Sequence, residues 1–288
     1  MNGNGPQNPV HGVQDNDPGE TEKQSQAQSD VPVEVGILTK GKPTLSMALV
    51  SLLLQEHRNI RIHIVDTSDS PVIKRDDVVF ALRLAFDREI PCGYEHSREK
   101  HRAFSVGRLK LLQALTGPNV CFMDDDVVMA SSTLMLMMPE LRANSDYGFI
   151  SPFCKNAGFV GGPLAGVLHF SPGGVFRQDP LVRKILLEYY ATTVDVLDSK
   201  KANEKVWEIS FLTELFNLLR RKCVVLPSTV TYHLDFRERP SNLNWDEGRL
   251  VRTSALKARE LVEKFAQAVS YPYAGNAVLR GDLPHTST

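Results

Sequence analysis

Cysteine is scarce in this sequence, and no two cysteines lie close together. The 288 residues contain four, at Cys92, Cys121, Cys154 and Cys223, with no Cys-x-x-Cys pair among them. A disulfide framework or a structural zinc site needs closer or more numerous cysteines, so we expect neither. Cys121 and Cys223 fall in apolar runs and are expected to be buried thiols. This pattern favours a reducing compartment, and we predict a cytoplasmic location.

Long apolar runs and an excess of one charge are also missing. No run approaches the ~20 residues of a membrane helix, and the N-terminus lacks the basic and apolar regions of a signal peptide. The formal net charge is only -1, which argues against a broad surface for binding nucleic acid. Hydrophobic residues make up 42% of the chain, so we expect a sizeable core.

The two ends of the sequence contain little that a core would bury. Residues 1–30 are rich in Asn, Gln, Gly, Pro, Asp and Ser, which is typical of a disordered tail. We expect a second flexible tail over residues 276–288. One folded domain is therefore predicted over residues 31–275.

The pattern at the start of this domain predicts a parallel sheet. An apolar strand over residues 31–39, a helix over 45–56 and a strand over 60–65 form a βαβ unit. Further strands are expected at residues 90–95, 120–129, 147–152, 164–170, 223–226 and 229–233. Further helices are expected at residues 76–89, 103–115, 180–190, 203–221 and 250–269, with a short one after residue 132 that Pro139 bends or restarts. The predicted fold is α/β, a mostly parallel sheet with helices on both faces.

Three adjacent acids, Asp124, Asp125 and Asp126, follow an apolar stretch that begins at Val120. Neighbouring carboxylates repel one another and are costly to desolvate, so they need a compensating cation. Oxygen ligands suit a hard divalent ion such as Mg²⁺ or Mn²⁺. In open α/β sheets, ligands bind beyond the carboxyl ends of the strands, which is where these acids are expected. The alternative is a solvated acidic turn.

The order of these features resembles the family 2 glycosyltransferases of the GT-A fold. The resemblance covers roughly residues 33–235. Its anchors are Thr39 after the first strand, Asp66 after the second, Arg108 nine residues before a glycine, the Asp-x-Asp motif at residues 124–126, and a Pro-x-x-x-x-Tyr-His ending at residues 227–233. Together and in this order, they are fairly specific.

The resemblance implies a metal-dependent, inverting enzyme of the hexosyltransferase class. It would move a sugar from a UDP- or GDP-linked donor to a glycan, lipid-linked or protein acceptor. Thr39, Asp66, Arg108 and Asp124 would contact the nucleotide. The ligands of Mn²⁺ or Mg²⁺ would be Asp124, Asp126 and His233, while Asp125 would orient its neighbours as a further catalytic-site acid.

The sequence departs from the family pattern at two positions. Leu109 stands where the family has the asparagine of Ala-Arg-Asn, and Ile209 stands where it has the aspartate expected to be the base. An inverting transfer needs a base for the acceptor hydroxyl. Glu208 is the nearest candidate, with Glu204 and Asp235 behind it.

Each assignment has a simpler alternative. His233 would be a packed strand-end histidine, Asp66 a turn former, Arg108 one member of a solvated basic helix face, and the three candidate bases ordinary surface acids. Two other functions also stay open. One is a nucleotidyltransferase of similar fold, although residues 39–42 resemble its glycine-rich phosphate loop only faintly. The other is a degenerate, non-catalytic module that binds nucleotide or glycan.

Overall fold

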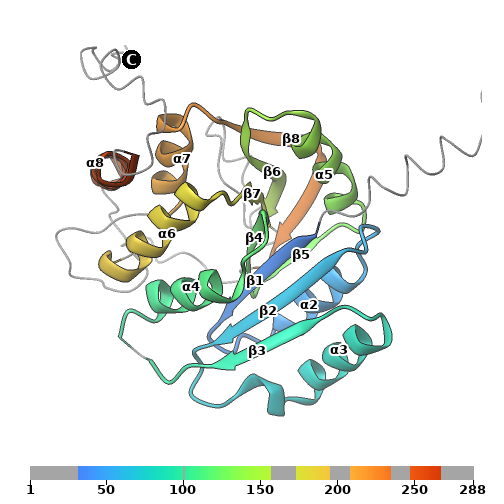
Figure 1. The fold of residues 1–288 in the computed structure, drawn as a ribbon. Coiled ribbons are helices and arrows are strands. Elements are labelled where there is room, and N and C mark those ends of the chain that lie inside the picture. The colour runs from blue at the N-terminus through green and yellow to red at the C-terminus, as the bar shows by residue number, and fades with distance from the viewer. Residues whose placement is uncertain (1–31, 100, 157–172, 195–207, 235–246, 267–288) are drawn as a thin grey trace, which may run out of the picture.

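The computed structural model describes most of the predicted domain (Figure 1). The described residues are 32–99, 101–156, 173–194, 208–234 and 247–266. Both predicted tails, the predicted strand at residues 164–170, and the acids Glu204 and Asp235 lie outside these ranges. In the described residues, no helix has the length and apolar character to cross a membrane.

The βαβ unit predicted at the start of the domain is confirmed. Strand β1 (Val33–Thr39) and strand β2 (Ile60–Asp66) pair in parallel, with α2 (Leu45–Leu53) between them. The side chains of β1 alternate between the two faces of the sheet, and all of its residues are buried. Burial on both faces explains why this strand is almost continuously apolar.

One sheet of eight strands holds the described elements together, in the order β3-β2-β1-β4-β7-β6-β8-β5. The remaining strands are β3 (Cys92–His96), β4 (Asn119–Asp124), β5 (Val127–Met129), β6 (Tyr147–Asn156), β7 (Val175–Arg177) and β8 (Lys222–His233). Strands β1 to β4 pair in parallel, and so do β6 and β8. The short strand β7 is antiparallel to both β4 and β6, so β4, β6 and β8 run in one direction.

Helices cover both faces of the sheet, as predicted (Figure 1). On one face lie α4 (Ala103–Ala114), α6 (Pro180–Thr192), α7 (Glu208–Leu218) and α8 (Glu247–Ala266). On the other lie α2, α3 (Asp76–Asp87) and α5 (Thr133–Ala143), with a short 3-10 helix, η1 (Val72–Lys74), before α3. Each layer has its own hydrophobic core, one centred on Phe122, Phe176 and Tyr189, the other on Ile37, Leu49 and Met137.

Three predicted elements differ in the structure. The strand predicted over residues 120–129 is two strands, β4 and β5, because the acids form a turn and β5 pairs antiparallel with β8. The two strands predicted around Pro227 are one strand, β8. Its register with β6 shifts between Pro152 and Phe153, and Pro227 lies in this irregular part of β8. Helix α5 is continuous through Pro139, which excludes the predicted restart but not the predicted bend.

One helix cap and one buried cysteine are as the sequence predicts. Asp179 caps α6 by accepting a hydrogen bond of 2.8 Å from the Val182 amide. All four cysteines are free thiols, and Cys121 is buried as predicted, whereas Cys223 is only half-buried.

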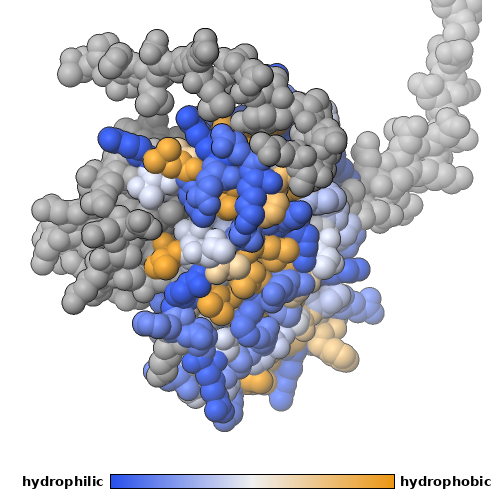
Figure 2. Space-filling model, turned by 60° about the vertical axis from the view of Figure 1, so that its left-hand side comes forward, coloured by the Kyte–Doolittle hydropathy of each residue, from blue (hydrophilic) through white to orange (hydrophobic). Residues whose placement is uncertain are grey.

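Large hydrophobic side chains at the surface are scattered over several elements. The two most exposed, Phe86 and Phe80, both lie on α3, with exposed fractions of 83% and 64%. Figure 2 shows one face of the molecule, on which hydrophilic side chains surround separate hydrophobic groups.

Candidate functional site

Four strand ends bring the predicted site residues to one edge of the sheet. In the parallel register, Thr39 lies opposite Asp66, and Leu38 lies opposite Asp124. Strand β8 runs in the same direction as β4, so its last residue, His233, reaches the same edge. Convergence at the carboxyl edge therefore follows from strand direction and register, as predicted for an α/β ligand site.

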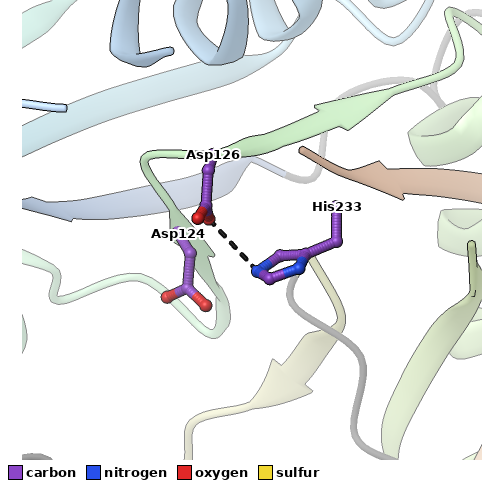
Figure 3. Close-up of side chains that lie close together, drawn as sticks. All are labelled: Asp124, Asp126 and His233. Atoms are coloured by element: carbon purple, nitrogen blue, oxygen red, sulfur yellow. Dashed lines mark ion pairs between the residues drawn. The ribbon is translucent and has the colours of Figure 1, made fainter. Parts of the chain in front are cut away.

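Asp124, Asp126 and His233 form a cluster in which each offers one ligand atom (Figure 3). These three atoms lie within 4.8 Å of one another, and Nε2 of His233 is 3.3 Å from Oδ1 of Asp126. Neighbouring oxygens around an ion bonded at about 2.1 Å are roughly 3 Å apart, so the pair needs little adjustment. Two carboxylates and an imidazole are suitable donors for Mn²⁺ and, less well, for Mg²⁺.

Asp126 is the most enclosed acid of this cluster, with 3% of its side chain exposed. Burial alone would raise its pKa, but the close contact with His233 and the hydrogen bond from Lys42 outweigh that effect and lower the pKa to about 2. Lys42 approaches from the turn after β1, donates to Oδ2 of Asp126, and lies 3.8 Å from Oδ1 of Asp125. Asp126 is therefore an anion at neutral pH.

Asp125 faces the turn after β1. The Thr39 hydroxyl donates to its Oδ2 over 2.6 Å and accepts from the Gly41 amide over 2.9 Å. Burial raises the pKa of Asp125, while the Thr39 hydrogen bond and the charge of Lys42 act against that rise. Thr39 and Asp125 thus tie the end of β1 to the acidic turn.

Arg108 is the centre of a second group of contacts. Its Nη2 donates to Oδ1 of Asp124 over 3.1 Å, and its Nε donates to Oε1 of Glu208 over 3.1 Å. Its guanidinium carbon lies 4.6 Å from the ring centre of Phe122 and 5.1 Å from that of Phe104. Only 4% of the Arg108 side chain is exposed, so the solvated alternative for this residue is wrong.

Close packing of α4 on β1 puts Arg108 in this place. A Cβ added at Gly107 would lie 2.3 Å from Cδ1 of Leu38, and one at Gly36 would lie 2.8 Å from Cδ1 of Leu115. A larger residue at either position would force the buried side chain of Leu38 or Leu115 to shift. The two glycines therefore let the next helical residue, Arg108, reach the end of β4.

Glu208 stands at the start of α7, where 13% of its side chain is exposed. It accepts hydrogen bonds from Arg108 and from the Tyr190 hydroxyl. Burial raises its pKa, and the charge of Arg108 acts against that rise. The surface-acid alternative is wrong for Glu208. Helix α7 thus brings an enclosed carboxylate to the end of β4, where Arg108 joins it to Asp124.

Asp66 uses its carboxylate to shape the loop after β2. It accepts from the amides of Ser68 and Val72, each over 2.8 Å, and from the Tyr94 hydroxyl over 2.7 Å. Burial would raise the pKa of Asp66, but these hydrogen bonds outweigh it and lower the pKa. The side chain therefore forms the turn that the sequence offers as an alternative, and its nucleotide contact stays a prediction.

Sequence reasoning did not assign two residues of the site, Lys42 and Tyr190. The signal for Lys42 is weak: a lysine next to Gly41 in the connection from strand to helix, a place where anion-binding loops occur. Tyr190 lies on α6 in an ordinary amphipathic pattern, which gives no sign that its hydroxyl meets Glu208.

Comparison with known proteins identifies the fold. No protein-family model matches the sequence, and no curated protein matches it. Solved structures do match. Staphylococcus aureus TarS 1–349 in complex with UDP-GlcNAc has a TM-score of 0.54 at 16% identity, covering 88% of this chain and 77% of that one. The mannosyltransferase PcManGT from Pyrobaculum calidifontis, in complex with GDP-Man and Mn²⁺, has a TM-score of 0.50 at 14% identity, covering 93% and 84%.

The chain is much shorter than another of these matches. It spans 37% of a longer S. aureus TarS structure, with a TM-score of 0.51 at 15% identity over 71% of this chain. At such identities the likeness shows the fold alone. That fold is the α/β, GT-A-like sheet that the sequence predicts.

Proposed function

We propose that this protein is a divalent-metal-dependent glycosyltransferase that takes its sugar from a UDP- or GDP-linked donor. The observation that carries the proposal is the cluster of Asp124, Asp126 and His233, whose ligand atoms lie within 4.8 Å of one another. Two neighbours in fold support it, since one is in complex with UDP-GlcNAc and the other with GDP-Man and Mn²⁺. The free thiols suit a reducing compartment, so we propose a cytoplasmic location.

The charges of the described site residues also support a divalent ion. Around the acidic turn, Lys42 and Arg108 face the four carboxylates of Asp124, Asp125, Asp126 and Glu208. An ion held by Asp124, Asp126 and His233 would offset the remaining negative charge. Mn²⁺ or Mg²⁺ bound there supplies Lewis-acid stabilisation of the diphosphate leaving group.

Glu208 is the proposed base. Its carboxylate would accept the proton of the acceptor hydroxyl as the oxygen attacks the anomeric carbon and the bond to the diphosphate breaks, with inversion. Arg108 holds Oε1 of Glu208 at 3.1 Å, whereas the distance from Arg108 to Oε2 is 3.5 Å, so Oε2 is the better-placed acceptor. Asp125 takes part indirectly, by holding the acidic turn against Thr39.

The nucleotide contacts of Thr39, Asp66, Arg108 and Asp124 belong to the same proposal. All four lie at one edge of the sheet, and all four are already hydrogen-bonded to protein groups. Asp124 is the most open of them, with 39% of its side chain exposed. We therefore expect direct contact with the donor first at Asp124. The acceptor, whether glycan, lipid-linked or protein, is left open.

Lys42 favours a second candidate function, that of a nucleotidyltransferase. A lysine after the first strand beside strand-end acids is a plausible phosphate contact for a nucleoside triphosphate. The two functions differ in their products. A nucleotidyltransferase joins a nucleoside triphosphate to a sugar phosphate and releases pyrophosphate. A glycosyltransferase releases a nucleoside diphosphate from its donor.

The test is an assay of donor turnover. The purified chain is incubated with a panel of UDP- and GDP-sugars, with and without acceptors, and in separate mixtures with nucleoside triphosphates and sugar phosphates. Each mixture contains Mn²⁺, Mg²⁺ or EDTA, and nucleoside diphosphate and pyrophosphate release are measured separately. We expect slow nucleoside diphosphate release with the divalent ion and none with EDTA. Pyrophosphate release from a nucleoside triphosphate would favour the nucleotidyltransferase. Nucleotide binding with no turnover in any mixture, acceptor panels included, would favour the non-catalytic module.

A further inference from the structure

We propose that Lys42 competes with the divalent ion for Asp126. When the ion is bound, the Lys42 side chain would turn away from Asp126 and pair with the diphosphate of the donor. This inference rests on the proposed function. It gives the lysine two opposite effects: weaker binding of the ion by itself, and tighter binding of a nucleoside diphosphate once the ion is present.

Competition follows from the geometry of Asp126. Its Oδ1 lies 3.3 Å from Nε2 of His233 and so faces the metal cluster, while its Oδ2 accepts from Lys42. A divalent ion on one oxygen and an ammonium on the other would share one carboxylate with 3% exposure. Two cations so close in an enclosed site repel each other strongly, because little water screens them. The ion therefore weakens the hold of Asp126 on Lys42.

The backbone around Lys42 is fixed, so only its side chain has to move. The Arg75 guanidinium donates to the carbonyl oxygens of Gly41 over 3.0 Å, Lys42 over 2.8 Å and Pro43 over 3.2 Å. Gly41 has a φ of 85°, which favours glycine, and its amide donates to Thr39. These contacts present Lys42 from a rigid turn.

The side chain of Lys42 has room for this movement. Its exposed fraction is 31%, against 7% for Asp125 and 3% for Asp126. A lysine is a point charge on a flexible four-carbon stem, so it can change partner without moving the backbone. At this edge of the sheet, the new partner would be the anionic diphosphate that the ion also contacts. The ion and the nucleotide would therefore bind cooperatively, and Lys42 would be one source of that coupling.

The experiment is a Mn²⁺ titration followed by electron paramagnetic resonance, with and without UDP, on the full chain. The variants are Lys42→Met and Lys42→Gln, so that one unstable protein does not decide the outcome. Lys40→Met is the matched control. Lys40 is an exposed lysine two residues earlier that forms no ion pair within the described part of the chain.

Without UDP, the Lys42 variants should bind Mn²⁺ roughly tenfold more tightly than the wild type, which corresponds to about 1.4 kcal/mol. At saturating Mn²⁺, their UDP affinity should fall by a similar factor. Lys40→Met should behave as the wild type in both. Unchanged or weaker Mn²⁺ binding without UDP, or unchanged UDP affinity, would overturn the inference. A wild-type protein that binds neither Mn²⁺ nor UDP would overturn the proposed function as well.

Discussion

Two cationic side chains, Lys42 and Arg108, contact the acidic turn, and they differ in burial and in the number of groups that hold them. Lys42 meets Asp125 and Asp126 from a surface turn, with 31% of its side chain exposed. Arg108 joins Asp124 to Glu208 between two aromatic rings, with 4% exposed. Both neutralise carboxylates of the same segment. The lysine can leave its acids, whereas the arginine is part of the core.

The physical chemistry of the two side chains explains this division. An arginine presents its donors in a rigid planar fork that satisfies two carboxylates and stacks on rings, whereas a lysine presents a flexible point charge. Removing one partner of a buried pair leaves a desolvated charge, which is costly, while an exposed pair contributes little. The arginine group is made of Arg108, Asp124, Glu208 and Tyr190. It should therefore stabilise the fold and hold the proposed base, Glu208, in position. The lysine side should respond to ligands.

The largest effect that would sharpen this comparison is on turnover. Glu208→Gln removes the proposed base but keeps the shape of the side chain beside Arg108, so turnover should fall by about 10²–10⁴ with UDP affinity unchanged. Steady-state kinetics and calorimetry measure the two quantities. Glu214→Gln, on the same helix and paired with Arg259 at 3.4 Å, is the control and should be near wild type. Full activity in Glu208→Gln would reduce the arginine group to a structural role.

The next effect is on stability and compares the two cations directly. Arg108→Met leaves Asp124 and Glu208 without their shared cation, and we expect the free energy of unfolding to fall by about 3–5 kcal/mol. Lys42→Met should lower it less, by about 1–3 kcal/mol, because His233 still lies beside the buried Asp126. Denaturant unfolding of both variants gives these values. Equal losses in the two variants would show that Lys42 and Arg108 contribute equally to stability, which would contradict the proposed difference between them.

The smallest effect concerns Asp66, an acid at the same edge whose hydrogen-bond donors are Ser68, Val72 and Tyr94 rather than either cation. Asp66→Ala leaves the Ser68 and Val72 amides without their acceptor and should lower the free energy of unfolding by about 1–3 kcal/mol. Thermal or denaturant unfolding checks this, with the exposed acid in Asp87→Ala as control. Unchanged stability together with weaker UDP binding would restore a purely nucleotide-contacting role.

The sequence predicts the elements that depend on local pattern. The apolar runs of β1, β2 and β4, the proline and capping aspartate of α6, and the acids at a strand end all follow from neighbouring residues. Strand direction then places Thr39, Asp66 and Asp124 at one edge without any knowledge of side-chain contacts. The His233 position also follows once β8 is parallel to β4.

Contacts between residues far apart in the chain cannot be predicted from local sequence patterns. Lys42 reaches Asp126 because Arg75, 33 residues further along, fixes its backbone. Tyr190 meets Glu208 only because α6 and α7 pack on the same face as α4. The merging of two predicted strands into β8 depends on an irregular register with β6, which no local signal gives. Local pattern thus finds the acids, and tertiary packing decides which cation each acid receives.

The most direct test of the central claim is to locate the ion. Crystals of the protein soaked with Mn²⁺ and UDP would be measured at the manganese absorption edge, with crystals of Asp126→Asn as the control. One anomalous peak within about 2.3 Å of ligand atoms of Asp124, Asp126 and His233 is the predicted result, and the peak should vanish or weaken sharply in the variant. An ion bound away from these three residues, or an unaltered peak in Asp126→Asn, would contradict the account.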